Sequence, residues 1–222
     1  MPPITPDQTV GDRRPIATRK RKWAQRATSW LVRRNVSPNL ISILGMIACI
    51  IAGVTLATTS FAYHRLEWLV AAAGAQLRLT ANMLDGMVAL ESGRSSRVGE
   101  LYNEVPDRIS DAAVFIGAGF AYGGNTTLGY IATILAISTA YVRAAGKIAG
   151  APSEFCGPMA KQHRMLIITV ICIYSAVTPR TWQMIPIDDS SIGVVTLGLV
   201  VIILGCVLTI VRRQARIVRA LT

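Results

Sequence analysis

Long apolar runs alternate with short basic segments along the chain. A helix rises about 1.5 Å per residue, so about 20 apolar residues span a hydrocarbon core about 30 Å thick. The pattern therefore predicts an all-α integral membrane protein with six transmembrane helices. We expect these at residues 40–63, at 68–89, at two segments within 112–142 separated by a Gly-Gly-Asn turn at 123–125, at 165–178 and at 192–211.

The composition agrees with a membrane protein. Of the 222 residues 52% are apolar and 16% are charged, whereas soluble chains carry about 25% charged residues. Most water-soluble folds are therefore excluded. The four cysteines (Cys49, Cys156, Cys172 and Cys206) have no paired spacing, so they predict neither a disulfide framework nor a metal site.

The net charge of +11 is distributed asymmetrically. If both termini are cytosolic, the basic residues of the N-terminal segment, of two loops and of the C-terminal end all lie on that side, and only Arg65 and Arg180 fall on the other. This arrangement follows the positive-inside rule. The charge thus indicates topology rather than nucleic-acid binding, and predicts a multi-pass protein of the bacterial cytoplasmic membrane whose termini and active site are cytosolic.

The chain divides into four parts. Residues 1–18, rich in proline, are predicted to be a disordered tail. Residues 19–36 place Trp23 and Trp30 at helical spacing among basic residues, which favours an interfacial amphipathic helix beside the active site; a plain topogenic basic segment is the alternative. A six-helix catalytic domain is expected at 37–213 and a basic cytosolic tail at 214–222.

Polar residues interrupt the second and third predicted helices. Asn82 and Asp85 lie three apart at the inner end of the second helix, and Asn103 and Asp107 lie four apart at the start of the third, so each pair shares a helix face. Hard divalent cations prefer such oxygen ligands, and Mg²⁺ often completes its shell with phosphate oxygens. Small residues lie where a phosphate and a neighbouring helix would approach, at Gly86, Ala89 and Gly99.

This stretch resembles the signature of the CDP-alcohol phosphatidyltransferases, D-x-x-D-G-x-x-A-R followed after eight or nine residues by G-x-x-x-D-x-x-x-D. The register matches without a gap. Five of the eight specified positions stand here, as Asp85, Gly86, Ala89, Gly99 and Asp107. Weaker similarity covers residues 37–39, 141–144 and 157–164, and six crossings also agree with that family.

The resemblance implies a phosphotransferase for substituted phosphate groups, which moves a group from a CDP-linked donor to an acceptor hydroxyl and releases CMP. In the family, carboxylates hold two divalent ions, Mg²⁺ or Mn²⁺, on the donor diphosphate, and the last aspartate is the base. By this resemblance Asp107 is the catalytic base and a metal ligand together with Asp85, while Gly86, Ala89 and Gly99 border the nucleotide.

The sequence departs from the signature at Asn82, Leu90 and Asn103. An amide oxygen still ligates a hard cation but brings no charge. The metal set Asp85, Asn82, Asn103 and Asp107 is therefore expected to bind metal more weakly or to hold a single ion. The alternative is a catalytically inactive relative that binds nucleotide or lipid.

Basic residues accompany this polar cluster. Arg143, Lys161 and Arg164 lie in family-like stretches at the cytosolic ends of the fourth and fifth helices, and we expect them to bind an acceptor phosphate or a lipid headgroup; topology alone is the alternative. Arg78 and Asp111 are expected at similar depth in the membrane, where they would pair with each other rather than leave a charge unpaired.

We therefore expect a membrane enzyme of phospholipid biosynthesis that transfers a phosphatidyl group from CDP-diacylglycerol to an alcohol acceptor. A soluble CDP-alcohol donating to diacylglycerol is the rival reaction. A transporter ranks last because no inverted repeat is present. The resemblance also implies a homodimer. Small residues such as Gly117, Gly119 and Gly129 favour helix packing within or between chains and do not decide between the two.

Overall fold

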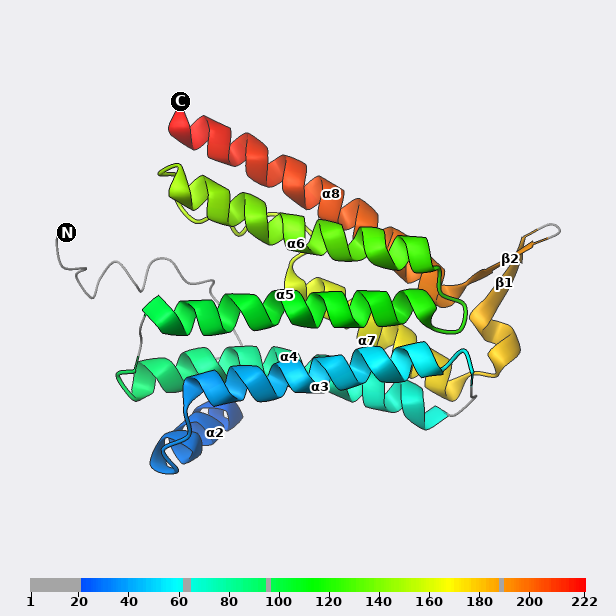
Figure 1. Ribbon diagram of the computed structural model, residues 1–222, viewed down its shortest axis with the longest axis horizontal. Helices are drawn as coiled ribbons and strands as arrows, with labels where there is room; N and C mark the ends of the chain where they lie inside the picture. Colours follow the sequence, from blue (N-terminus) through cyan, green and yellow to red (C-terminus); the bar gives the residue numbers. More distant parts are fainter. Residues whose placement is uncertain (1–20, 62–64, 95–96, 188–189) are drawn as a thin grey trace.

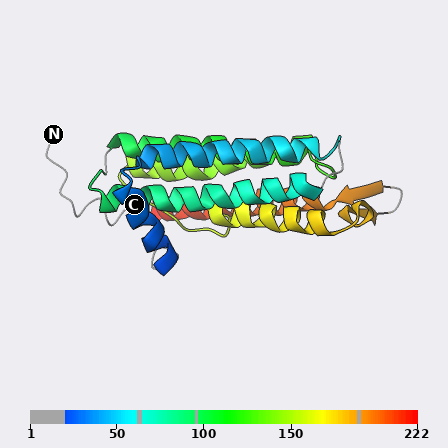
Figure 2. The ribbon, with the colours of Figure 1, turned by 90° about the horizontal axis from the view of Figure 1, so that it is seen from below.

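The computed structural model describes residues 21–61, 65–94, 97–187 and 190–222. Within these ranges, six long helices lie side by side (Figure 1). They are α3 (Pro38–Thr58), α4 (Arg65–Glu91), α5 (Arg97–Phe120), α6 (Thr126–Ile148), α7 (Lys161–Val177) and α8 (Val194–Leu221). Seen at right angles, they form two layers, α3, α5 and α6 over α4, α7 and α8 (Figure 2).

Each predicted apolar run corresponds to one of these helices, although the ends differ. The sixth crossing was predicted to end at Val211, whereas helix α8 itself continues to Leu221 and takes in most of the predicted cytosolic tail; the end of the crossing stays a prediction. Over the described residues, three helices are long and apolar enough to cross a membrane, namely α3, α6 and α8. The count of six crossings therefore stays a prediction.

A shorter helix, α2 (Lys22–Arg33), packs against α4 and projects from the bundle (Figure 2). It buries Ala24 and Thr28 and leaves Trp23 and Trp30 exposed. The helix lies inside the segment predicted to be helical, and its exposed tryptophans are compatible with an interface location. The predicted disordered tail, residues 1–18, lies outside the described residues.

A β-hairpin follows α7 at the opposite end of the bundle from α2 (Figure 1). The 3₁₀ helix η2 (Arg180–Gln183) leads into β1 (Met184–Ile187), which pairs antiparallel with β2 (Ser190–Gly193), and Ile185 lies opposite Ile192. This hairpin was not predicted, because strands of four residues are too short to show an alternating pattern.

The bundle packs through small residues. A Cβ atom at Gly117 on α5 would overlap the carbonyl of Gly53 on α3, and one at Gly129 on α6 would overlap the backbone of Gly119 on α5. The expected helix packing by these glycines thus occurs within one chain. Large apolar side chains such as Val54 and Leu204 point outward, which is the surface a lipid environment stabilises.

Candidate active site

The polar faces of α4 and α5 meet inside the bundle. The two helices run antiparallel (Figure 1), so the second half of α4 faces the first half of α5. The Asn82 side-chain amide on α4 donates to Asp107 Oδ2 on α5 at 3.2 Å. The metal set expected from the sequence requires these two pairs of residues to approach each other, and Asn82 and Asp107 do.

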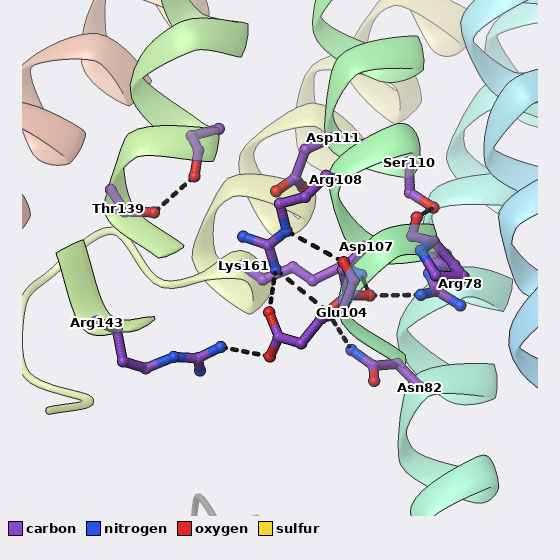
Figure 3. Close-up of polar contacts among 12 residues, drawn as sticks. Arg78, Asn82, Glu104, Asp107, Arg108, Ser110, Asp111, Thr139, Arg143 and Lys161 are labelled. Atoms are coloured by element: carbon purple, nitrogen blue, oxygen red, sulfur yellow. Dashed lines mark hydrogen bonds and ion pairs between the residues drawn. The ribbon is translucent and has the colours of Figure 1, made fainter. Parts of the chain in front are cut away.

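Asp107 is buried and surrounded by positive charge (Figure 3). Arg78 Nη2 lies 2.5 Å from its Oδ1, and the Lys161 ammonium contacts the same oxygen. Arg108 Nη2 lies 3.7 Å from Oδ2. Because Asn82 donates to Oδ2 as well, both oxygens of Asp107 have protein partners.

The expected pair of Arg78 with Asp111 is wrong. Arg78 pairs with Asp107 and also donates to the Ser42 carbonyl at 2.9 Å, whereas Asp111 accepts from Arg164 Nη2 at 2.6 Å. A step of four residues turns a helix about 40° beyond a full turn. Residues matched in depth therefore need not share a face, and α5 directs Asp111 toward Arg164 on α7.

Asp85 has a different environment. It is 4% exposed, and its Oδ2 accepts a hydrogen bond from the Ser42 hydroxyl on α3. Its Oδ1 is buried and has no hydrogen-bond partner among the residues that the structure describes, and the same holds for Oδ1 of Asn103. A buried oxygen without a donor is costly unless a ligand or an ion completes it.

These two oxygens belong to side chains at one depth. Asn82 and Asp107 meet at one level of the bundle. Asp85 follows Asn82 by three residues on α4, a rise of about 4.5 Å, and Asn103 precedes Asp107 by four residues on α5, a rise of about 6 Å. Because the two helices are antiparallel, both displacements have the same direction. Helix α3 reaches this region because Gly45 has no side chain, since a Cβ atom there would overlap Ala81.

The fit to a divalent metal depends on these oxygens. In the part of the chain that the structure describes, no three Asp, Glu, His or Cys side chains are grouped to hold a metal ion. One carboxylate oxygen from Asp85 and one amide oxygen from Asn103 still suit a hard cation that completes its shell with phosphate oxygens. Of the four residues expected to bind metal, these two therefore fit, while Asn82 and Asp107 are bonded to each other.

The three basic residues expected to bind an anion differ in their surroundings. Arg164 is 2% exposed and is held by Asp111, by the Met159 carbonyl at 2.9 Å and by Thr139 at 3.4 Å. These internal partners favour a structural role. Arg143 pairs with the exposed carboxylate of Glu104, and Lys161 pairs with Asp107, so both adjoin the polar cluster.

The small residues expected beside a nucleotide lie toward the end of the bundle at which α4 ends and α5 begins. Gly86 and Ala89 follow Asp85 on α4, and Gly99 precedes Asn103 by about one turn on α5. Leu90, which stands at the arginine position of the signature, is 50% exposed.

Ser42 and the pairing of Glu104 with Arg143 were missed from the sequence. Ser42 is a single hydroxyl in an apolar run, and hydroxyls in such runs commonly bond to their own helix. Nothing in the local pattern distinguishes a serine that bonds to a neighbouring helix.

Comparison with known proteins identifies the family of this chain. The profile of the CDP-alcohol phosphatidyltransferase family matches residues 35–211. A phosphatidylinositol phosphate synthase of Streptomyces avermitilis is 27% identical over 197 residues, which cover 84% of this chain and 77% of that protein. The chain belongs to the CDP-alcohol phosphatidyltransferase family and is a membrane-bound phosphotransferase of phospholipid biosynthesis.

Solved structures share the fold. The crystal structure of Mycobacterium tuberculosis phosphatidylinositol phosphate synthase with CDP-DAG bound aligns with a TM-score of 0.70 at 21% identity, covering 89% of this chain and 94% of that one. The same enzyme in complex with manganese and citrate aligns with a TM-score of 0.69 at 21% identity, covering 87% and 88%. At this identity the likeness concerns the fold alone.

Proposed function

We propose that this protein transfers a phosphatidyl group from CDP-diacylglycerol to an alcohol acceptor and releases CMP. The observation that carries the proposal is the different environment of the two aspartates that match the family signature, Asp85 and Asp107. Asp85 on α4 offers a buried oxygen that has no donor among the described residues. Asp107 on α5 lies about one helix turn further along the bundle and is held by Asn82, Arg78 and Lys161.

Asp85 and Asn103 would hold a divalent cation, Mg²⁺ or Mn²⁺, on the donor diphosphate. A bound cation neutralises charge on the phosphate oxygens during displacement. The manganese in the mycobacterial structure supports a metal of this kind. Gly86, Ala89 and Gly99 would leave room for the nucleotide at the adjoining helix ends.

Asp107 would act as the base. It takes the proton of the acceptor hydroxyl as that oxygen bonds to the phosphorus that carries the diacylglycerol, and the bond from this phosphorus to the CMP oxygen breaks. The released CMP keeps the electron pair of that bond. For this role Asp107 needs a free lone pair, and we propose that Lys161 turns an N–H group from Asp107 Oδ1 to a phosphate oxygen of the substrate and stays beside the carboxylate, while Arg78 keeps its contact with Oδ1.

The acceptor is proposed to be a phosphorylated polyol that enters from the cytosolic side. Arg143 would bind its phosphate, because this arginine adjoins the cluster through an exposed ion pair with Glu104 that a phosphate can replace. The Streptomyces relative, a phosphatidylinositol phosphate synthase, supports an acceptor of this class.

The test measures CMP released by the purified protein from CDP-diacylglycerol in detergent micelles with Mg²⁺ or Mn²⁺. Acceptors are supplied one at a time as phosphorylated and unphosphorylated polyols, and a metal-free reaction is the control. Metal-dependent CMP release with one acceptor supports the proposal. Release only when a soluble CDP-alcohol and diacylglycerol are supplied would reverse donor and acceptor. Bound CDP-diacylglycerol without any turnover would support the inactive alternative.

A further inference from the structure

The two carboxylates at the centre of the site differ in what neutralises them. Asp107 contacts Arg78 and Lys161 through one oxygen and has Asn82 and Arg108 beside the other. Among the described residues Asp85 forms no ion pair, and its Oδ2 accepts a hydrogen bond from the neutral hydroxyl of Ser42. Cations thus contact Asp107 directly, whereas near Asp85 the Arg78 guanidinium donates to the Ser42 carbonyl and forms no ion pair with the Asp85 carboxylate.

The oxygens without a hydrogen-bond partner belong to Asp85 and Asn103, which form no ion pair among the described residues. Oδ1 of Asp85 and Oδ1 of Asn103 are buried without partners, and Asp85 is almost fully buried. Buried oxygens of this kind favour cation binding, because water does not solvate these oxygens and no donor among the described residues bonds to them. This side of the cluster is therefore equipped for a metal ion.

The other side already contains its cation. The Lys161 ammonium contacts Asp107 Oδ1, and the Lys161 side chain is only 12% exposed. A divalent ion at Asp107 would have to displace this ammonium and would lie beside Arg78, a buried guanidinium that always carries its charge. Repulsion between these like charges disfavours an ion at this position.

We infer that the site takes one divalent cation, at Asp85 and Asn103, and that Lys161 supplies at Asp107 the positive charge that a second cation would bring. The inference rests on the proposed function for the identity of the substrate diphosphate. It differs from the two ions that the resemblance implies. The inference also explains Asn82 and Asn103. Where the family signature has two aspartates, these neutral residues remove two negative charges, which one further divalent ion would balance.

The experiment counts bound ions directly. Mn²⁺ is titrated into the full chain in detergent, with and without CDP-diacylglycerol, and free Mn²⁺ is measured by electron paramagnetic resonance against protein-free micelles. We expect one Mn²⁺ per chain. Asp85→Asn should weaken binding by at least about 10-fold, as expected for loss of the charged ligand, while Asp107→Asn should retain the single ion.

The double variant Asn82→Asp with Lys161→Met tests the role of the lysine. It removes the ammonium from Asp107 and adds a carboxylate beside it, so we expect a second bound Mn²⁺. The matched control is Asn125→Asp with Lys22→Met, which makes the same chemical changes at exposed positions away from the site; it should bind one ion. Elution as a single species in gel filtration identifies folded variants.

Two ions in the wild-type chain, no ion at all, or loss of the ion in Asp107→Asn would overturn the inference. A second ion absent from a folded double variant would overturn the role of Lys161. CMP release measured in parallel separates this inference from the proposed function. One bound ion without turnover would contradict the function alone, and turnover with two bound ions would contradict the inference alone.

Discussion

The buried pair of Asp111 and Arg164 provides a sharp test of the structure. Their side chains are 0% and 3% exposed, and Arg164 Nη2 lies 2.6 Å from Asp111 Oδ2. The substitution Asp111→Asn keeps the shape of the side chain but removes its charge. Arg164 then remains buried with neutral partners, among them the Met159 carbonyl and Thr139, and without a counter-charge in contact among the described residues.

The magnitude follows from this burial. Breaking a buried ion pair from one side costs about 3–5 kcal/mol, because the remaining charge is left without a partner in a medium of low polarity. For a chain of this size 1 kcal/mol shifts the melting temperature by about 2–4 °C, so we expect Asp111→Asn to lower it by about 6–20 °C.

The assay is thermal unfolding in detergent micelles. The matched control is Glu104→Gln, which breaks the ion pair with Arg143. The Glu104 side chain is 47% exposed, and exposed ion pairs contribute about 0–1 kcal/mol to stability. Replacing both buried partners, as Asp111→Leu with Arg164→Met, should recover much of the lost stability, since no buried charge remains. A melting temperature for Asp111→Asn within about 2 °C of wild type would refute the reasoning.

Three further predictions concern the site and the packing around it. Asp107→Asn should lower CMP release by about 10²–10⁴-fold, the usual effect of losing a general base, with Glu67→Gln at the other end of α4 as the matched control. Ser42→Ala should weaken Mn²⁺ binding by about 10–100-fold, measured by titration, because the hydroxyl that orients Asp85 is lost. Gly117→Val should abolish folding, seen as aggregation in gel filtration, because its side chain would overlap the Gly53 carbonyl.

Each of these has a contrary outcome. Full turnover by Asp107→Asn would remove the assignment of the base. Unchanged Mn²⁺ affinity in Ser42→Ala would mean that the orientation of Asp85 does not depend on this hydroxyl. A monodisperse Gly117→Val variant that melts like the wild type would contradict the close approach of α3 and α5.

The sequence predicted the long helices because each apolar run carries its own signal. A membrane-length run needs no partner to be recognised, and the Gly-Gly-Asn turn at 123–125 does separate α5 from α6. The ends were less predictable. Helix α8 continues through four arginines, which are good helix formers, so the charge that marks the membrane boundary does not end the helix.

The helix faces that carry the candidate site residues were predictable, and the partners of these residues were not. The spacing of Asn82, Asp85, Asn103 and Asp107 determined which helix faces carry them, and the contact of Asn82 with Asp107 agrees with it. The hydrogen bond from Ser42 to Asp85 joins residues 43 apart in sequence. No local pattern indicates such a contact.

By itself the sequence determined the apolar runs, the register of the family signature and the loss of two carboxylates from it, because these are properties of residue type and spacing along one helix. The tertiary structure alone decided which cation neutralises which carboxylate. Arg78 meets Asp107 and Arg164 meets Asp111 because the rotation of each packed helix about its axis selects the partner, and that rotation is set by how neighbouring helices pack, down to single glycines at their contacts.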